Sequence, residues 1–233
     1  MDGQEHNARM VTTFQWIVVL VLAVGMAACA SGQLPRRDRY FPADVDDMHQ
    51  QWFGSQLRAM KEPVLGKRVT RQTGITELRV LCLPTLGHGV AVRYTFDDNA
   101  ATRRAVELTG KGGYAPGRIA IDRTTSMSHE ETATLLASLD ASGFWSMPVE
   151  EDTDIVVMDG TMVVVEAVRD GAHRVIARPE PGAGADKRGL AKFFDFYMQA
   201  FDAADVGRLE DPASRGSCIE EWQGEPESGS PSN

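Results

Sequence analysis

Glu166 is the side chain whose position most suggests chemistry, because it is a carboxylate within the apolar stretch 161–168. The next apolar stretch, 173–178, follows Asp170-Gly171, a residue pair typical of a two-residue type I′ turn. Such a turn fixes the strand register, so we expect Glu166 to lie diagonal to His173 on one face of a hairpin. A carboxylate and an imidazole in this arrangement can exchange a proton with a substrate.

The Glu166/His173 pair lacks the companions that catalysis requires. No nucleophile, third polar partner or metal-ligand spacing accompanies it in the sequence. We therefore favour a structural or solvent-facing pair over a catalytic one. Arg178 is added to it as a third member of a tentative polar surface site, although the alternation of strand side chains puts Arg178 and Arg174 on the opposite face.

Cys29 is the other residue with a defined chemical prospect. It ends an apolar run, residues 16–30, that is too short for a comfortable membrane span but suits the apolar region of a secretory signal. The segment Met26-Ala27-Ala28-Cys29 resembles a bacterial lipobox, in which the cysteine is lipidated and becomes the first residue. Two alternatives remain open: cleavage after Ala30, which would release a soluble protein, and an uncleaved anchor.

The resemblance to a lipobox implies an address as well as a modification. Ala30, rather than an aspartate, follows the cysteine, which resembles lipoproteins sorted to the outer membrane of Gram-negative bacteria. We expect a signal peptide over 1–28, a polar tether over 29–43, a single domain over 44–204 and an acidic, mostly disordered tail over 205–233. The expected location is the bacterial cell envelope, on the periplasmic face of the outer membrane.

Cys82 and Cys218 are left as a pair if lipid occupies Cys29. An even number of cysteines in an oxidising compartment indicates a disulfide. Cys82 also lies in the apolar run "LRVLCLP", so a plain buried thiol is an equal alternative.

Charge and composition exclude some classes of protein. The chain of 233 residues has a net charge of -9, and its tail from Asp202 onward holds eight acidic residues against two arginines. With no run of basic residues longer than Arg36-Arg37, the chain lacks the electrostatic footprint of a nucleic-acid-binding protein. The expected partners are the membrane, through the lipid anchor, and an envelope protein of unknown identity.

The acidic segment 149–160 is the best candidate for a metal in the sequence. It contains five carboxylates, but the alternating pattern of a calcium loop and its distal glutamate are absent. A solvated acidic loop is favoured over a calcium site, and no two histidines have metal-ligand spacing. We expect neither a metal nor a cofactor. The glycine-rich segment 110–117 is interpreted as a turn between strands, because its spacing does not fit a phosphate-binding loop.

The elements that must position these residues form an α+β pattern. Helical spacing predicts a first helix within 43–60, capped by Asp44, and a last one within 187–201. Between them, Ser128 and Glu131 predict a capping box on a helix that ends at Gly143. Alternating apolar segments predict strands at 77–84, 90–96, 102–109, 117–123, 161–168 and 173–178. We expect an antiparallel sheet of about six strands with helices packed on one face.

Residues 48–181 resemble a family of small bacterial envelope proteins. The matching features are the Trp52-Phe53 helix with "QLRAMKEPVL", "HGVAVR", "GKGGYAPGRIAIDR" and "GFWSMP", followed by Asp159-Gly160, Glu166, Asp170-Gly171, Arg178 and Pro181. The resemblance implies a fold and an envelope location, and it implies no particular reaction.

The sequence thus predicts a lipid-anchored cell-envelope protein that binds a partner or serves as an accessory protein, without enzymatic activity. The alternative is an envelope hydrolase that uses Glu166 with a nearby histidine, His173 or His88.

Overall fold

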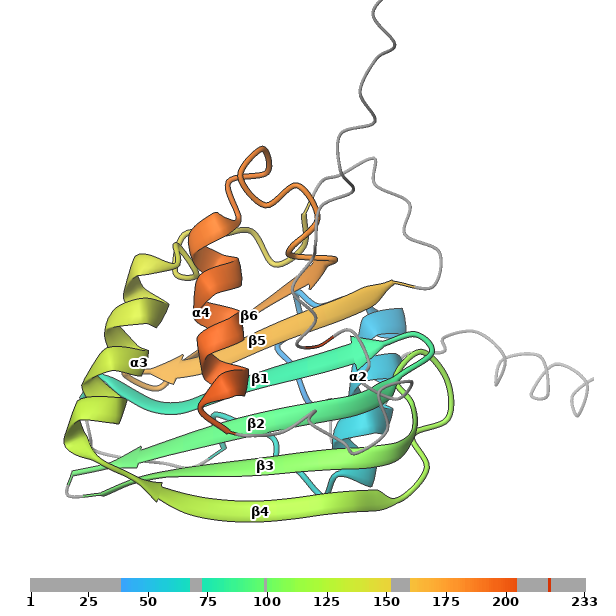
Figure 1. Ribbon diagram of the computed structural model, residues 1–233, viewed down its shortest axis with the longest axis horizontal. Coiled ribbons are helices and arrows are strands. Elements are labelled where there is room, and N and C mark those ends of the chain that lie inside the picture. The colour runs from blue at the N-terminus through green and yellow to red at the C-terminus, as the bar shows by residue number, and fades with distance from the viewer. Residues whose placement is uncertain (1–38, 68–72, 99, 152–159, 205–217, 219–233) are drawn as a thin grey trace, which may run out of the picture. The chain divides into compact units, whose positions relative to one another are not determined.

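The architecture of the chain comes from a computed structural model, which describes residues 39–67, 73–98, 100–151, 160–204 and 218. Three helices and six strands follow one another in these residues (Figure 1). They are α2 (Asp47–Ala59), β1 (Ile75–Pro84), β2 (His88–Asp97), β3 (Ala100–Lys111), β4 (Ile119–Met127), α3 (His129–Ala141), β5 (Thr161–Arg169), β6 (Ala172–Pro179) and α4 (Ala191–Asp202).

The six strands form one antiparallel sheet in the order β4-β3-β2-β1-β5-β6. Both the α+β class and the six-stranded antiparallel sheet agree with the sequence-based expectation. β1 lies inside the sheet between β2 and β5, which come from different parts of the chain. In the register, Arg79 of β1 stands between Arg93 of β2 and Glu166 of β5. This register brings charged side chains from separate hairpins into one row.

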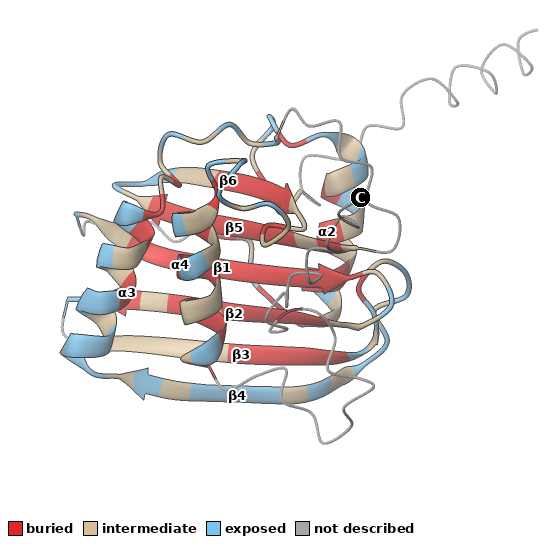
Figure 2. Cartoon of the chain, turned by 45° about the horizontal axis from the view of Figure 1, so that its top comes forward, coloured by how far each residue is buried: buried red, intermediate tan, exposed pale blue. Residues whose placement is uncertain are grey.

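Helices cover both faces of the sheet, which corrects the expectation that they share one face. α3 and α4 pack on the face that carries Val80, Val92 and Val165. α2 packs on the opposite face, against Leu81, Ala91 and Val164. Figure 1 shows α2 behind the sheet and the other two helices in front, and Figure 2 shows the central strands buried while β4 stays largely exposed. The protein therefore has two apolar cores separated by the sheet.

The N-cap of α2 lies two residues later in the chain than Asp44, the predicted cap. The side chain of Asp46 caps the helix by accepting hydrogen bonds from the backbone N–H groups of Met48 and His49. Helical spacing then brings Phe53 and Leu57 to the sheet side, where both are buried.

Two local predictions are confirmed. Ser128 and Glu131 form a capping box at the start of α3, with Ser128 Oγ accepting from Glu131 N at 3.1 Å and Ser128 N donating to Glu131 Oε2 at 2.7 Å. Asp170 and Gly171 both have positive φ, at 52° and 78°, as a type I′ turn requires. This turn sets the β5–β6 register on which the predicted Glu166/His173 pair depends.

The predicted signal peptide, Cys29 and nearly all of the acidic tail lie outside the described residues. The described residues begin at 39, within the expected tether, and Phe41 is already buried against Phe53. Among the described residues, no helix is both long and apolar enough to cross a bilayer.

Candidate functional site

Glu166 and His173 meet as the turn geometry predicts. Glu166 faces Val175 across the β5–β6 hairpin, and its Oε2 lies 3.1 Å from Nε2 of the diagonal His173. The glutamate is fully buried, with 0% of its surface exposed, so it is not part of a polar surface. A buried carboxylate requires compensation by a positive charge or by hydrogen bonds.

Arg79 provides that positive charge, and sequence reasoning missed it. Its Nε and Nη2 both donate to Glu166 Oε1, at 2.8 and 2.5 Å, across the β1–β5 pair. Arg79 is as deeply buried as Glu166, with 0% exposure. The carboxylate is thus held between a guanidinium on one side and an imidazole on the other.

Glu62 joins this pair to two further arginines. Its Oε2 accepts from Arg93 Nε at 2.9 Å and lies 3.4 Å from Arg79 Nη1, while its Oε1 accepts from Arg104 Nη1. Arg104 also makes two bonds to Asp122 of β4. We call Glu62, Arg79, Arg93, Arg104, Asp122, Glu166 and His173 the charged row, which runs across β4, β3, β2, β1, β5 and β6 beneath the end of α2.

The chain just after α2 brings Glu62 onto the sheet. Lys61 adopts a positive φ of 56°, which turns the chain at the helix end, and Pro63 prevents the helix from continuing. Two carbonyl groups of this turn also accept hydrogen bonds: Met60 O accepts from Arg104 and Pro63 O accepts from Arg79. The charged row therefore fastens the C-terminal end of α2 to the sheet.

The sequence does contain a signal for the charged row. Arg79, Arg93 and Arg104 each interrupt an apolar strand segment, and the register pairs Arg79 with Arg93 and Arg93 with Arg104. Three neighbouring arginines on one sheet face require carboxylates nearby, because like charges repel strongly away from water. The hairpin pattern alone predicts the position of Glu166. Glu62 lies in the turn after α2, whose position depends on the tertiary fold.

Arg178 belongs to the other face of the sheet and to no common site with Glu166. It is buried, and its guanidinium donates to the carbonyls of Pro148, Val149 and Ala177. Burial lowers the pKa of Arg178 below its ordinary value. The tentative surface site of Glu166, His173 and Arg178 is therefore not formed. Glu166 and Arg178 are buried, and Arg178 lies on the opposite face of the sheet from the other two residues.

His88, the other histidine of the hydrolase alternative, contacts a different carboxylate. Its Nδ1 lies 2.9 Å from Oε1 of the buried Glu107. Glu107 pairs with Val90 and shares the face of α3 and α4, so the sheet separates it from Glu166. The structure thus brings His173 to Glu166 and keeps His88 apart from it.

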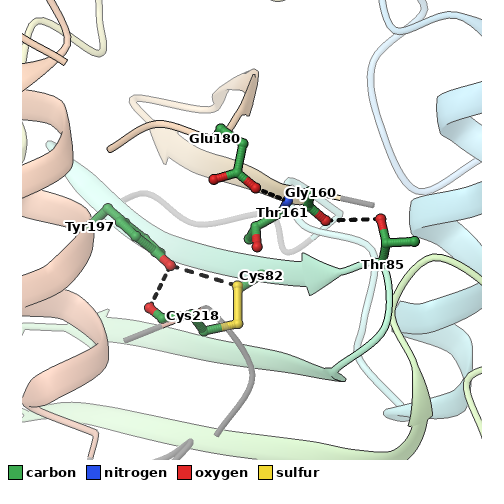
Figure 3. Close-up of a disulfide and its surroundings, with 7 residues drawn as sticks. All are labelled: Cys82, Thr85, Gly160, Thr161, Glu180, Tyr197 and Cys218. Carbon is green, nitrogen blue, oxygen red and sulfur yellow. Dashed lines mark hydrogen bonds between the residues drawn. A yellow bond between two sulfur atoms is a disulfide. The ribbon is translucent and has the colours of Figure 1, made fainter. Parts of the chain in front are cut away.

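Cys82 and Cys218 form a disulfide (Figure 3). The bond joins β1 to a residue 136 positions further along the chain, beneath α4. Tyr197 of α4 donates its hydroxyl to Cys218 O at 2.5 Å, and burial raises the pKa of this tyrosine. Of the two alternatives that the sequence left open for these cysteines, the structure has the disulfide.

One group of side chains among the described residues could hold a metal ion: Asp46, His49 and Glu150, whose ligand atoms lie within 4.8 Å of one another. Glu150 belongs to the acidic segment 149–160, but Glu151 is bound to Arg188 instead. The other carboxylates of that segment, Asp152, Asp154 and Asp159, lie outside the described residues.

No protein family model matches this chain, and no curated protein matches it well enough to count as a relative. The functional assignment accordingly depends on the residues and their geometry.

Proposed function

We propose that the protein is a lipid-anchored component of the bacterial cell envelope that binds a partner or assists assembly there, rather than an enzyme. The disulfide between Cys82 and Cys218 is the observation that carries the proposal. Disulfides of this kind persist in oxidising compartments such as the periplasm and are rare in the cytosol.

The disulfide also bears on Cys29. The chain has three cysteines, and the bond uses two of them. Cys29 is left without a partner in the chain, at the end of an apolar run that resembles a lipobox. A single leftover cysteine at that position supports lipidation, and several acyl chains on it would suffice for stable anchoring. The proposed location is the periplasmic face of the outer membrane, in line with the resemblance of residues 48–181 to small envelope proteins.

The contacts of Glu166 favour a binding or accessory role over catalysis. Its two oxygens are engaged by Arg79 and His173 in a buried setting. A general acid or base must reach a substrate proton within hydrogen-bond distance. The Glu166 carboxylate instead binds Arg79, which contacts Glu62 and so helps to hold the end of α2 on the sheet.

Expression of the wild type and of Cys29→Ser in a Gram-negative host tests the proposal. We expect the wild type in the membrane fraction, with mass spectrometry showing a mature N-terminus at an acylated Cys29. Cys29→Ser should lose the lipid and keep its signal segment. Wild-type protein that starts at Ser31 without lipid, or that stays in the cytosol, would contradict the proposal. Cross-linking in intact cells followed by purification then identifies the partner.

An envelope hydrolase is the second candidate, and the 3.1 Å contact between Glu166 and His173 is the observation that favours it. Glu166→Gln keeps the size of the side chain and removes its charge. A hydrolase that uses this carboxylate would lose activity in a variant that remains folded by circular dichroism, whereas a binding protein would keep its cross-linked partner.

A further inference from the structure

We propose that Asp46, His49 and Glu150 form a binding site for a divalent transition-metal ion, and that Zn²⁺ is the ion whose ligand preferences they match. The three side chains are not part of the charged row or of the disulfide. Two of them come from the start of α2, and the third comes from the segment after α3, 101 positions away along the chain.

The ligand atoms are close to the spacing that a bound ion requires. His49 Nδ1 lies 2.9 Å from Glu150 Oε1 and also contacts Asp46 Oδ2, and all three ligand atoms lie within 4.8 Å of one another. Two ligands bound tetrahedrally to Zn²⁺ at about 2.1 Å lie about 3.4 Å apart. Small side-chain rotations are therefore enough to admit the ion.

The charges of the group call for a cation. Two carboxylates approach the same ring nitrogen, and Nδ1 carries at most one proton to donate. When Nδ1 donates its proton to one carboxylate, the other carboxylate is left beside a second negative charge with no proton between them. A divalent ion that replaces the proton contacts both oxygens and the nitrogen lone pair together.

Neighbouring groups already hold two of the ligands. Asp46 Oδ1 accepts from Met48 N and His49 N, at 2.8 and 3.0 Å, so its Oδ2 is directed by the helix cap. The imidazole of His49 stacks on Phe53 at a centroid distance of 4.8 Å.

The donor set distinguishes between ions. Calcium takes six to eight oxygen ligands, whereas an imidazole nitrogen with two carboxylates suits zinc, with water in the fourth position. The helix N-terminus opposes a cation with about half a positive charge, but two carboxylates outweigh it. The carboxylates of Asp46 and Glu150 are both about half exposed, at 46% of the side-chain surface, so water has access to the ion.

Calorimetric titration of the purified full-length protein with Zn²⁺ tests the proposal. The protein is kept in detergent, carries a Strep tag and is first treated with a chelator, so that no tag or residual metal competes. We expect one Zn²⁺ per chain at this site, with affinity reduced at least tenfold in His49→Ala and in Glu150→Gln. Asp46→Asn should weaken binding as well, while the asparagine preserves the helix cap. Glu130→Gln, at an exposed residue of α3, is the control and should bind as the wild type does.

Two outcomes would overturn the proposal. One is a wild type that takes up no Zn²⁺ at millimolar concentration, or whose affinity is the same in Glu150→Gln, a loop variant that leaves the α2 cap in place. The other is Ca²⁺ binding tighter than Zn²⁺ at the same residues, which would contradict the assignment to a transition metal. Neither outcome depends on the membrane location proposed above.

Discussion

Arg79 is the residue on which the buried charges of the α2 face depend. Its guanidinium contacts both Glu166 and Glu62 and is excluded from water. Removing one member of a buried ion pair leaves an uncompensated charge, which costs about 3 to 5 kcal/mol. We therefore expect Arg79→Met to lower the free energy of unfolding by about that amount, measured by urea denaturation.

A double variant separates the cost of the orphaned charge from the value of the pair. Arg79→Met combined with Glu166→Met removes both charges and fills the space with apolar atoms. Since well-packed apolar residues often replace a buried ion pair at little cost, the double variant should recover most of the loss. A double variant less stable than either single one would show that the pair itself contributes the stability.

The sequence predicts the contact between Glu166 and His173 in the charged row but not the contacts of Glu62. Glu166 and His173 are seven residues apart, and a two-residue turn between them leaves only one register. Glu62 follows α2 and reaches the sheet only because that helix lies on one particular face. Nothing local fixes this choice, so the contact of Glu62 with Arg93 and Arg104 could not be read from spacing.

α3 is the element whose start the sequence defines best. Ser128 satisfies Glu131 N, and the carboxylate of Glu131 satisfies Ser128 N in return. Replacing a capping serine by alanine costs about 1 kcal/mol, so Ser128→Ala should lower the free energy of unfolding by about this amount. Ser126→Ala, in the exposed part of β4, is a matched control, and an equal loss in both variants would contradict the capping role.

The expectation that all helices share one face was wrong for a reason visible in the strands. Nine of the ten residues of β1 are buried, so side chains of both parities are covered. A sheet with one solvated face gives strict alternation, whereas a strand buried on both faces gives a continuous apolar run. "LRVLCLP" and "MVVVEAV" are such runs. Such runs indicate that both faces of the sheet are covered, and α2 is the helix that covers the second face.

The stability of the whole molecule should depend on pH in the acidic range. A hydrogen bond from Arg188 lowers the pKa of Glu151 below its ordinary value of 4.5, and bonds from Ser128 do the same for Glu131. A folded-state pKa below the unfolded one stabilises the protein above the unfolded value, and this contribution is lost as the pH falls through the folded value. We expect the melting temperature to fall progressively below pH 4.5.

Glu151→Gln checks the source of that pH dependence. The variant should be less stable than the wild type near neutral pH and should lose less on acidification, because glutamine does not titrate in this range. Glu130→Gln should keep the wild-type slope. Equal slopes for Glu151→Gln and the wild type would show that the Glu151–Arg188 contact makes no contribution in solution.

The disulfide is the single covalent constraint between the sheet and the chain beyond α4 among the described residues. A bond that closes a loop of 136 residues stabilises by up to about 5 kcal/mol in the chain-entropy model. Reduction, or the double variant Cys82→Ala with Cys218→Ala, should therefore lower the melting temperature strongly and change the mobility on a non-reducing gel. Unchanged mobility together with titratable thiols at both positions would contradict the bond.

Tyr197→Phe distinguishes the covalent link from the packing around it. This variant removes the hydrogen bond from the tyrosine hydroxyl to Cys218 O but leaves the two sulfur atoms joined. A buried hydrogen bond contributes about 1 kcal/mol, and Cys218 O would lose a partner, so the loss should be about 1 to 3 kcal/mol. Because reduction should cost more stability than this change, Cys218 is held to the core mainly by the bond to Cys82 and to a lesser degree by the hydrogen bond from α4.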